Sequence, residues 1–183
     1  MSKFFYFFLL IVLYTSNLSA SIKENIIQNL KSINNISFDF EQNINGKIEK
    51  GKCKIEYPKK IFCEYDLDNK KILISDGKSL VIKTSSSYYL YPLDKTPLNF
   101  ILDKFFLVNK IHSLQERIIE KKYVNFSFIE NENEIHLFFD RENFNLIGWQ
   151  TQDIYQNLSI MYISSIRKNE KIQKNLFNLP LRN

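Results

Sequence analysis

The spacing of apolar and polar residues changes period once near the start of the chain and then keeps a period of two. From Ile36 to Phe40 the two kinds of residue alternate strictly, and the alternation recurs over residues 50–57 and 61–65. This pattern is typical of half-buried strands in an antiparallel sheet with one apolar face. Further strand-like segments follow at 71–75, 79–84, 88–91, 118–128, 134–139, 144–152 and 158–166. The pattern predicts about ten strands in meander order, forming one large curved antiparallel sheet.

Two segments have the character of helices instead. Residues 21–31 place Ile22, Ile26, Ile27 and Leu30 at intervals of three and four, which predicts an amphipathic helix that caps the core. The segment 98–107 is apolar around most of its circumference, so it can contact the protein on two sides. It directly follows a strand, with Thr96 as the expected N-cap and Pro97 at the first helical position. An apolar helix in this place can act as a lid on the sheet.

The first twenty residues have the pattern of an export signal. Lys3 precedes an apolar run over residues 4–13, and small or polar residues follow up to Ala20. A run of this length is too short to span a bilayer and matches the apolar region of a signal peptide. We expect cleavage near Ala20, one domain over residues 21–183, and a periplasmic location; an uncleaved anchor is the alternative.

Charge and chemistry exclude several classes of function. The formal net charge is +5, and basic residues alternate with acidic ones, whereas nucleic-acid binding requires a basic stripe. The two histidines, His112 and His136, lie in separate segments without metal-ligand spacing. Glu132 and Glu134 lie in an Asn-rich turn, where a solvated hairpin tip is the simpler interpretation of a carboxylate pair. We therefore expect no metal, no cofactor, no nucleic acid and no enzyme activity.

The two cysteines lie on strands that are expected to pair. By the alternation above, Cys53 and Cys63 share a face, so they are either directly opposite or one diagonal apart. A direct pair would form a disulfide in an oxidising periplasm. Two buried free thiols remain the other reading of the same spacing.

Several short motifs, taken in order, resemble one known family. They are Phe38-x-Phe40-x-Gln42, Gly51 with Tyr57-Pro58, Phe62-x-Glu64-Tyr65, Ser75-Asp76-Gly77-Lys78, Tyr91-Pro92-Leu93, Thr96-Pro97-Leu98, Trp149 with Asp153, Phe177 and Leu179-Pro180. No single motif is specific, but their order and spacing cover nearly all of the chain after the export signal. The chain resembles the outer-membrane lipoprotein carrier family, the periplasmic LolA proteins.

The resemblance implies an α+β, mainly β fold, in which a strongly curved antiparallel sheet forms an incomplete barrel with a helical lid over an apolar cavity. It also implies a monomeric carrier that takes acylated lipoproteins from an inner-membrane ABC transporter and passes them to an outer-membrane receptor. The alternative is a related half-barrel sensor or scaffold that binds a protein partner. The expected cavity and lid contacts are Phe40, Ile55, Ile61, Leu98, Phe100, Ile101 and Leu102.

One position departs from the family pattern. The resemblance implies an arginine before the turn proline, where it bonds the closed lid, but this chain has Tyr57. A phenol offers one hydrogen-bond donor and no fixed charge, whereas a guanidinium offers five donors. Tyr57 is therefore either an altered lid latch or an aromatic residue that only fills the sheet face.

Overall fold

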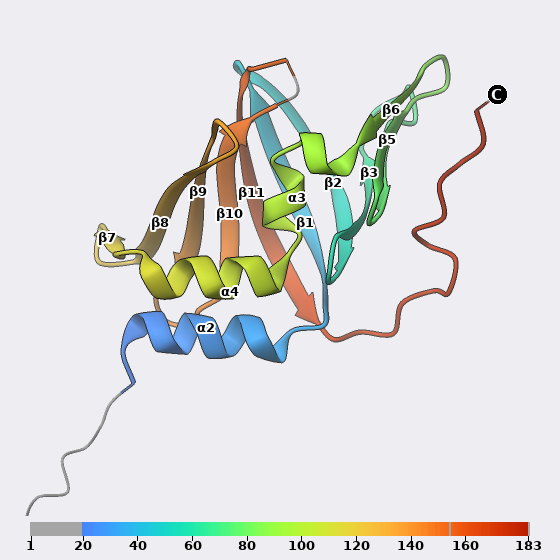
Figure 1. Ribbon diagram of the computed structural model, residues 1–183. Coiled ribbons are helices and arrows are strands. Elements are labelled where there is room, and N and C mark those ends of the chain that lie inside the picture. The colour runs from blue at the N-terminus through green and yellow to red at the C-terminus, as the bar shows by residue number, and fades with distance from the viewer. Residues whose placement is uncertain (1–19, 154, 183) are drawn as a thin grey trace, which may run out of the picture.

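The computed structural model describes residues 20–153 and 155–182, and its main element is one antiparallel sheet of eleven strands (Figure 1). Residues 1–19 of the expected export signal lie outside the described residues. The strands are β1 (Asn35–Ile44), β2 (Lys47–Glu56), β3 (Lys60–Tyr65), β4 (Ile72–Asp76), β5 (Ser79–Lys83), β6 (Tyr88–Pro92), β7 (Arg117–Ile119), β8 (Tyr123–Glu130), β9 (Asn133–Asp140), β10 (Leu146–Gln152) and β11 (Leu158–Lys168). The prediction of a mainly β fold with a single antiparallel sheet is confirmed.

The sheet consists of two meanders joined in its middle. Its strand order is β6-β5-β4-β3-β2-β1-β11-β10-β9-β8-β7, so β6 and β7 are the edges and the sheet does not close. The central pair is β1 with β11, in which Phe40 lies opposite Ile163. The first and last strands of the chain therefore hold the two halves together.

One of the predicted strands is wrong. Residues 118–128 form the short strand β7 and the longer strand β8, which pair with each other. Between them, Glu120 and Lys121 have positive φ angles of 50° and 57°. Two successive residues with positive φ are typical of a tight hairpin turn, although glycine or asparagine usually occupies it. The polar run Glu120-Lys121-Lys122 is therefore a turn, and the sheet has eleven strands instead of about ten.

The first predicted helix is confirmed as α2 (Ile22–Ser32). Ser21 caps it, because its hydroxyl oxygen accepts a hydrogen bond from the backbone N–H of Glu24 at 3.1 Å. Ile26, Ile27 and Leu30 are buried on the face that the spacing predicts.

The prediction of one helix over residues 98–107 is wrong. After the 3₁₀ turn η2 (Leu93–Lys95), the segment forms α3 (Leu98–Ile101) and α4 (Lys104–Ser113). Asp103 starts the second helix, since its carboxylate accepts hydrogen bonds from the N–H groups of Phe105 and Phe106, both at 3.1 Å. This cap competes with continuation of α3, and the chain turns between the two helices.

The expected capping role of the Thr96 side chain is also wrong. Its hydroxyl donates back to the carbonyl oxygen of Leu93 at 2.8 Å and so closes η2. Pro97 does adopt the right-handed helical conformation, with φ −60° and ψ −25°, directly before α3. The proline thus begins the helical path without a side-chain cap before it.

The helices cover one face of the curved sheet. Figure 1 shows α4 across the lower ends of β8–β10, α2 beside α4 below these strand ends, and α3 in front of the middle strands. Between the helices and the sheet lies a continuous apolar core, whose largest fully buried side chains include Phe38, Phe126 and Phe139. Trp149 meets Phe38 edge to face, with ring centroids 6.5 Å apart. α2 and α4 both bury apolar side chains in this core.

Cys53 on β2 lies directly opposite Cys63 on β3, and the structure joins their buried side chains in a disulfide. The spacing allowed the two cysteines to be directly opposite or one diagonal apart, and the structure places them directly opposite. The bridge ties together two neighbouring strands in the half of the sheet that α2 and α4 leave uncovered.

We predict that protein purified under oxidising conditions has no thiol that reacts with an alkylating reagent, as measured by mass spectrometry without reduction. Reduction should lower the melting temperature, because the bridge restricts the unfolded chain, but a short loop of this kind stabilises by at most ~3 kcal/mol. Two alkylated cysteines in native protein would contradict the disulfide.

Candidate functional site

A pocket opens on the same face of the sheet as the core, beside the helices. Its volume is about 380 Å³, which lies within the ~300–1,000 Å³ range of ligand pockets. The apolar part of its wall includes Ile61, Leu73, Leu80, Ile82, Tyr91, Leu98, Trp149 and Met161. Ile61, Trp149 and Met161 also belong to the buried core, so the pocket is a continuation of the core that no side chain fills.

The floor of the pocket is built by two neighbouring rows of residues across β10, β11, β1 and β2. The register places one row as Trp149, Met161, Gln42 and Glu49, and the other as Thr151, Ser159, Ile44 and Lys47. The second row lies at the strand ends, next to the connecting loops. The floor is therefore mixed: apolar deeper along β10 and β11, and increasingly polar toward the loops and toward β2.

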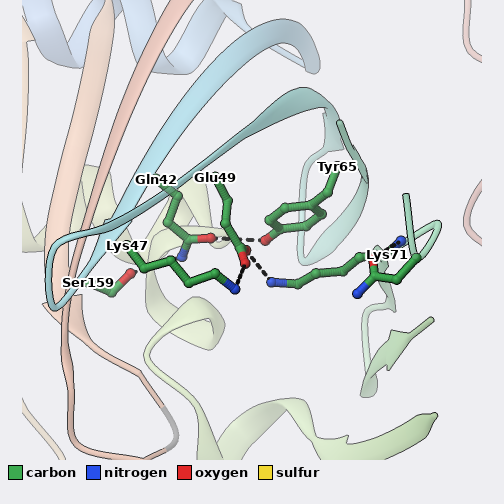
Figure 2. A network of polar contacts seen from close by, with 7 residues as sticks. Gln42, Lys47, Glu49, Tyr65, Lys71 and Ser159 are labelled. Atoms are coloured by element: carbon green, nitrogen blue, oxygen red, sulfur yellow. Dashed lines mark hydrogen bonds and ion pairs between the residues drawn. The ribbon is translucent and has the colours of Figure 1, made fainter. Parts of the chain in front are cut away.

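A polar network occupies one side of this floor (Figure 2). Glu49, whose side chain is only 5 % exposed, accepts hydrogen bonds from the ammonium groups of Lys47, at 2.7 Å, and of Lys71. Burial would raise the pKa of Glu49, but the hydrogen bonds and charges of the two lysines hold it below its ordinary value. Each carboxylate oxygen of Glu49 thus accepts a hydrogen bond from one lysine.

The network continues through neutral groups toward β11. The Tyr65 hydroxyl donates to Gln42 Oε1 at 3.0 Å, and Gln42 Nε2 donates to Ser159 Oγ at 3.0 Å. Lys71 Nζ lies 4.1 Å from the centroid of the Tyr65 ring, close enough for a cation–π contact. Burial, and secondarily the charge of Glu49, raises the pKa of Tyr65, so its phenol stays protonated and a donor.

Two of the expected contact residues, Ile61 and Leu98, line the pocket. The others pack in the core and do not line it; they are Phe40, Ile55, Phe100, Ile101 and Leu102. Phe40 packs edge to face on Tyr65, with ring centroids 4.9 Å apart, and so lies one layer behind the pocket wall.

The sequence reasoning missed the polar part of the pocket. Gln42 follows Phe38 and Phe40 on the inward-facing side of β1, and Glu49 precedes Cys53 and Ile55 on that side of β2. A polar residue at a position where the alternation expects an apolar one is the signal that could have identified this site. Both residues lie near the ends of their strands and line the pocket.

Tyr57 lies directly after β2, partly buried against the core. Its backbone N–H donates to the carbonyl oxygen of Asn34 at 2.9 Å. Its hydroxyl has no hydrogen-bond partner within residues 20–153 and 155–182. Burial raises the pKa of this phenol, which remains neutral.

Two lysines attach the α3–α4 junction to the rest of the protein. The backbone N–H of Lys59 donates to the carbonyl oxygen of Leu102 at 2.7 Å, and Lys59 Nζ lies 3.6 Å from Asp103 Oδ2. The buried Lys104 points its ammonium group at the end of α2, where it donates to the Ile33 carbonyl oxygen and to Asn34 Oδ1. These contacts are few, and they lie at one end of α3 and α4.

Within the described residues, no group of three or more His, Cys, Asp or Glu side chains is arranged to hold a metal ion. His136 lies beside Glu134, with Nε2 3.1 Å from the carboxylate, and its Nδ1 meets the hydroxyl of Ser127. No helix in the described part of the chain is long and apolar enough to cross a membrane.

Comparison with solved structures finds matches at low sequence identity. A LolA superfamily protein from Nitrosomonas europaea is 10% identical, with 87% of this chain and 99% of that chain covered and a TM-score of 0.48. A putative outer membrane lipoprotein-sorting protein domain from Vibrio parahaemolyticus is 8% identical, with 86% and 97% covered and a TM-score of 0.47. The lipoprotein LppX of Mycobacterium tuberculosis is 10% identical, with 83% and 98% covered and a TM-score of 0.43.

Comparison of the sequence gives the family. No curated protein sequence matches the chain significantly. The family described as "Outer membrane lipoprotein carrier protein LolA" matches residues 31–180, which confirms the resemblance seen in the short motifs. This match spans most of the sequence, and the chain therefore belongs to the LolA family.

Proposed function

We propose that this protein is a periplasmic carrier that shelters the acyl chains of lipoproteins between an inner-membrane ABC transporter and an outer-membrane receptor. The observation that carries the proposal is the apolar pocket beside the helices, which continues the core. The protein acts as a monomer and catalyses no reaction in this proposal. Family membership supports binding of lipoproteins or protein partners in general, and the pocket favours lipid.

The physical need for such a shelter is large. A tri-acylated lipoprotein carries on the order of 45 methylene groups, and their exposure to water costs about 0.8 kcal/mol each, or tens of kcal/mol in all. A methylene is roughly as large as a water molecule, which takes ~30 Å³ in the liquid. The pocket of about 380 Å³ therefore encloses only part of such a ligand.

Movement of α3 and α4 would supply the remaining room. Phe100, Ile101 and Leu102 pack against the core, where acyl chains could replace them without exposing apolar surface to water. Lys59 and Lys104 make the polar contacts at the α3–α4 junction. At the far end of α4, Lys110 pairs with Glu130 on β8, and Lys23 donates to the carbonyl oxygen of Leu114. In this proposal α3 and α4 are the lid. The side chains that become ligand contacts once it opens are Phe40, Ile55, Phe100, Ile101 and Leu102.

Mass spectrometry of material that co-purifies from the periplasm tests the proposal directly. We expect acylated lipoproteins in the purified fraction. A stoichiometric unlipidated protein in their place would contradict the carrier function and support the half-barrel scaffold.

We predict that Leu98→Asp strongly reduces binding of an environment-sensitive fatty-acid probe, measured by its fluorescence, while circular dichroism shows a folded sheet. Leu98 lines the pocket and is only partly buried, so a charge there disturbs the ligand more than the core. Leu90→Asp is the matched control, because Leu90 is 57 % exposed and lies outside the pocket wall. Equal probe binding by Leu98→Asp and native protein would place the ligand elsewhere.

A second prediction concerns the lid. Lys104→Met removes the ammonium group that holds α4 to the end of α2; since hydrogen bonds of charged groups contribute ~1.5–3 kcal/mol, the open population and the apparent probe affinity should rise. Tyr57→Phe should bind as the native protein does, because the lost hydroxyl has no partner in the described structure. Tyr57→Arg should bind more weakly, since a guanidinium can bond lid carbonyls.

The same titrations identify the latch. If Tyr57→Phe changes the affinity and Lys104→Met does not, the latch lies at Tyr57, and the assignment to Lys104 is wrong.

A further inference from the structure

We propose that the pocket contains a site for the carbonyl group at the head of an acyl chain, formed by the hydroxyls of Thr151 and Ser159. This inference rests on the proposed function, and it specifies O-acyl esters as the chemistry that the pocket recognises. It concerns the polar edge of the pocket floor, which the burial of acyl chains does not explain.

Thr151 is a buried polar residue without a partner. It is 7 % exposed, lines the pocket, and its Oγ1 is the one fully buried side-chain polar atom in the described part of the chain that lacks a hydrogen bond. A buried hydroxyl without a partner costs free energy, and such groups are rare in folded proteins. A ligand atom that accepts a hydrogen bond from Oγ1 would remove this cost.

Ser159 offers a second donor next to it. The two residues are directly opposed on β10 and β11, a position at which Cβ atoms lie roughly 4.5–5.5 Å apart. Ser159 Oγ accepts from Gln42 Nε2, and in the described structure its own proton has no acceptor. A carbonyl oxygen has two lone pairs and can accept from both hydroxyls at once.

The surroundings favour a neutral ligand group over an anion. The ammonium groups of Lys47 and Lys71 are already bonded to the Glu49 carboxylate. Thr151 and Ser159 offer two neutral hydroxyl donors, which match a neutral acceptor such as an ester carbonyl.

The apolar side chains of the pocket floor indicate in which direction a bound acyl chain runs. Trp149 lies two residues before Thr151 on β10, and Met161 lies two residues after Ser159 on β11. The pair Trp149 and Met161 is therefore further from the strand ends than the pair Thr151 and Ser159. An acyl ester bound here would place its carbonyl beside Thr151 and Ser159 and its hydrocarbon against Trp149 and Met161.

Two probes that differ in one carbonyl group test this inference. Displacement of the fatty-acid probe by 1-palmitoylglycerol, an ester, is compared with displacement by 1-O-hexadecylglycerol, the ether with the same chain length. The native protein should prefer the ester by about threefold to tenfold, the effect of one neutral hydrogen bond. Thr151→Val, which keeps the shape but removes the donor, should abolish this preference, and Thr151→Ser should keep it.

Stability provides an independent readout on the same variants. Without ligand, Thr151→Val should melt at the same or a higher temperature than the native protein, because it removes an unpaired buried hydroxyl. Thr96→Val is the matched control: Thr96 lines the same pocket, but its hydroxyl is bonded to Leu93. This control should melt at a lower temperature and retain the preference for the ester.

The outcomes separate the two proposals. Equal displacement by ester and ether in the native protein would overturn the carbonyl site and leave the acyl-chain pocket intact. Failure of both probes to displace would overturn the pocket itself and the carbonyl site with it. An ester preference that survives in Thr151→Val would show that other groups recognise the carbonyl.

Discussion

The concave face of the sheet is larger than the helices that cover it, and the rest of the structure depends on this mismatch. α2 and α4 pack their apolar sides over one part and form a closed core with residues such as Phe126 and Phe139. Over β3–β6 and the loop ends of β1, β2, β10 and β11, no side chain completes the packing, and the pocket remains. The core stabilises the fold, and its unfilled continuation is available for a ligand of the same apolar character.

Much of the fold could be predicted from the sequence, because the spacing of apolar residues within a short segment indicates a helix or a strand. The period of two from Ile36 onward and the spacing of Ile26, Ile27 and Leu30 reflect which face each residue buries, so they identify strands and α2. The predictions were wrong where a capping side chain or a tight turn interrupts a helix or strand. The Asp103 cap divides the segment 98–107, and a turn with positive φ at Glu120 and Lys121 divides the segment 118–128.

The candidate site was less predictable, because it depends on which strands become neighbours. Its apolar members, such as Ile61 and Leu98, follow from alternation and from the resemblance. Its polar members come together only through the pairing of β1 with β11, which joins residues far apart in the sequence. Gln42 and Ser159 bond across this pair, and no local pattern connects them.

The pairing of β1 with β11 also has a consequence for the order of events in folding. Ile36 pairs with Lys168, so the middle of the sheet cannot form until nearly the whole chain has emerged from the ribosome. Contacts of such high sequence separation slow folding, because a long loop must be closed before they form. A growing chain that lacks its last strand therefore keeps the two halves of the sheet unjoined.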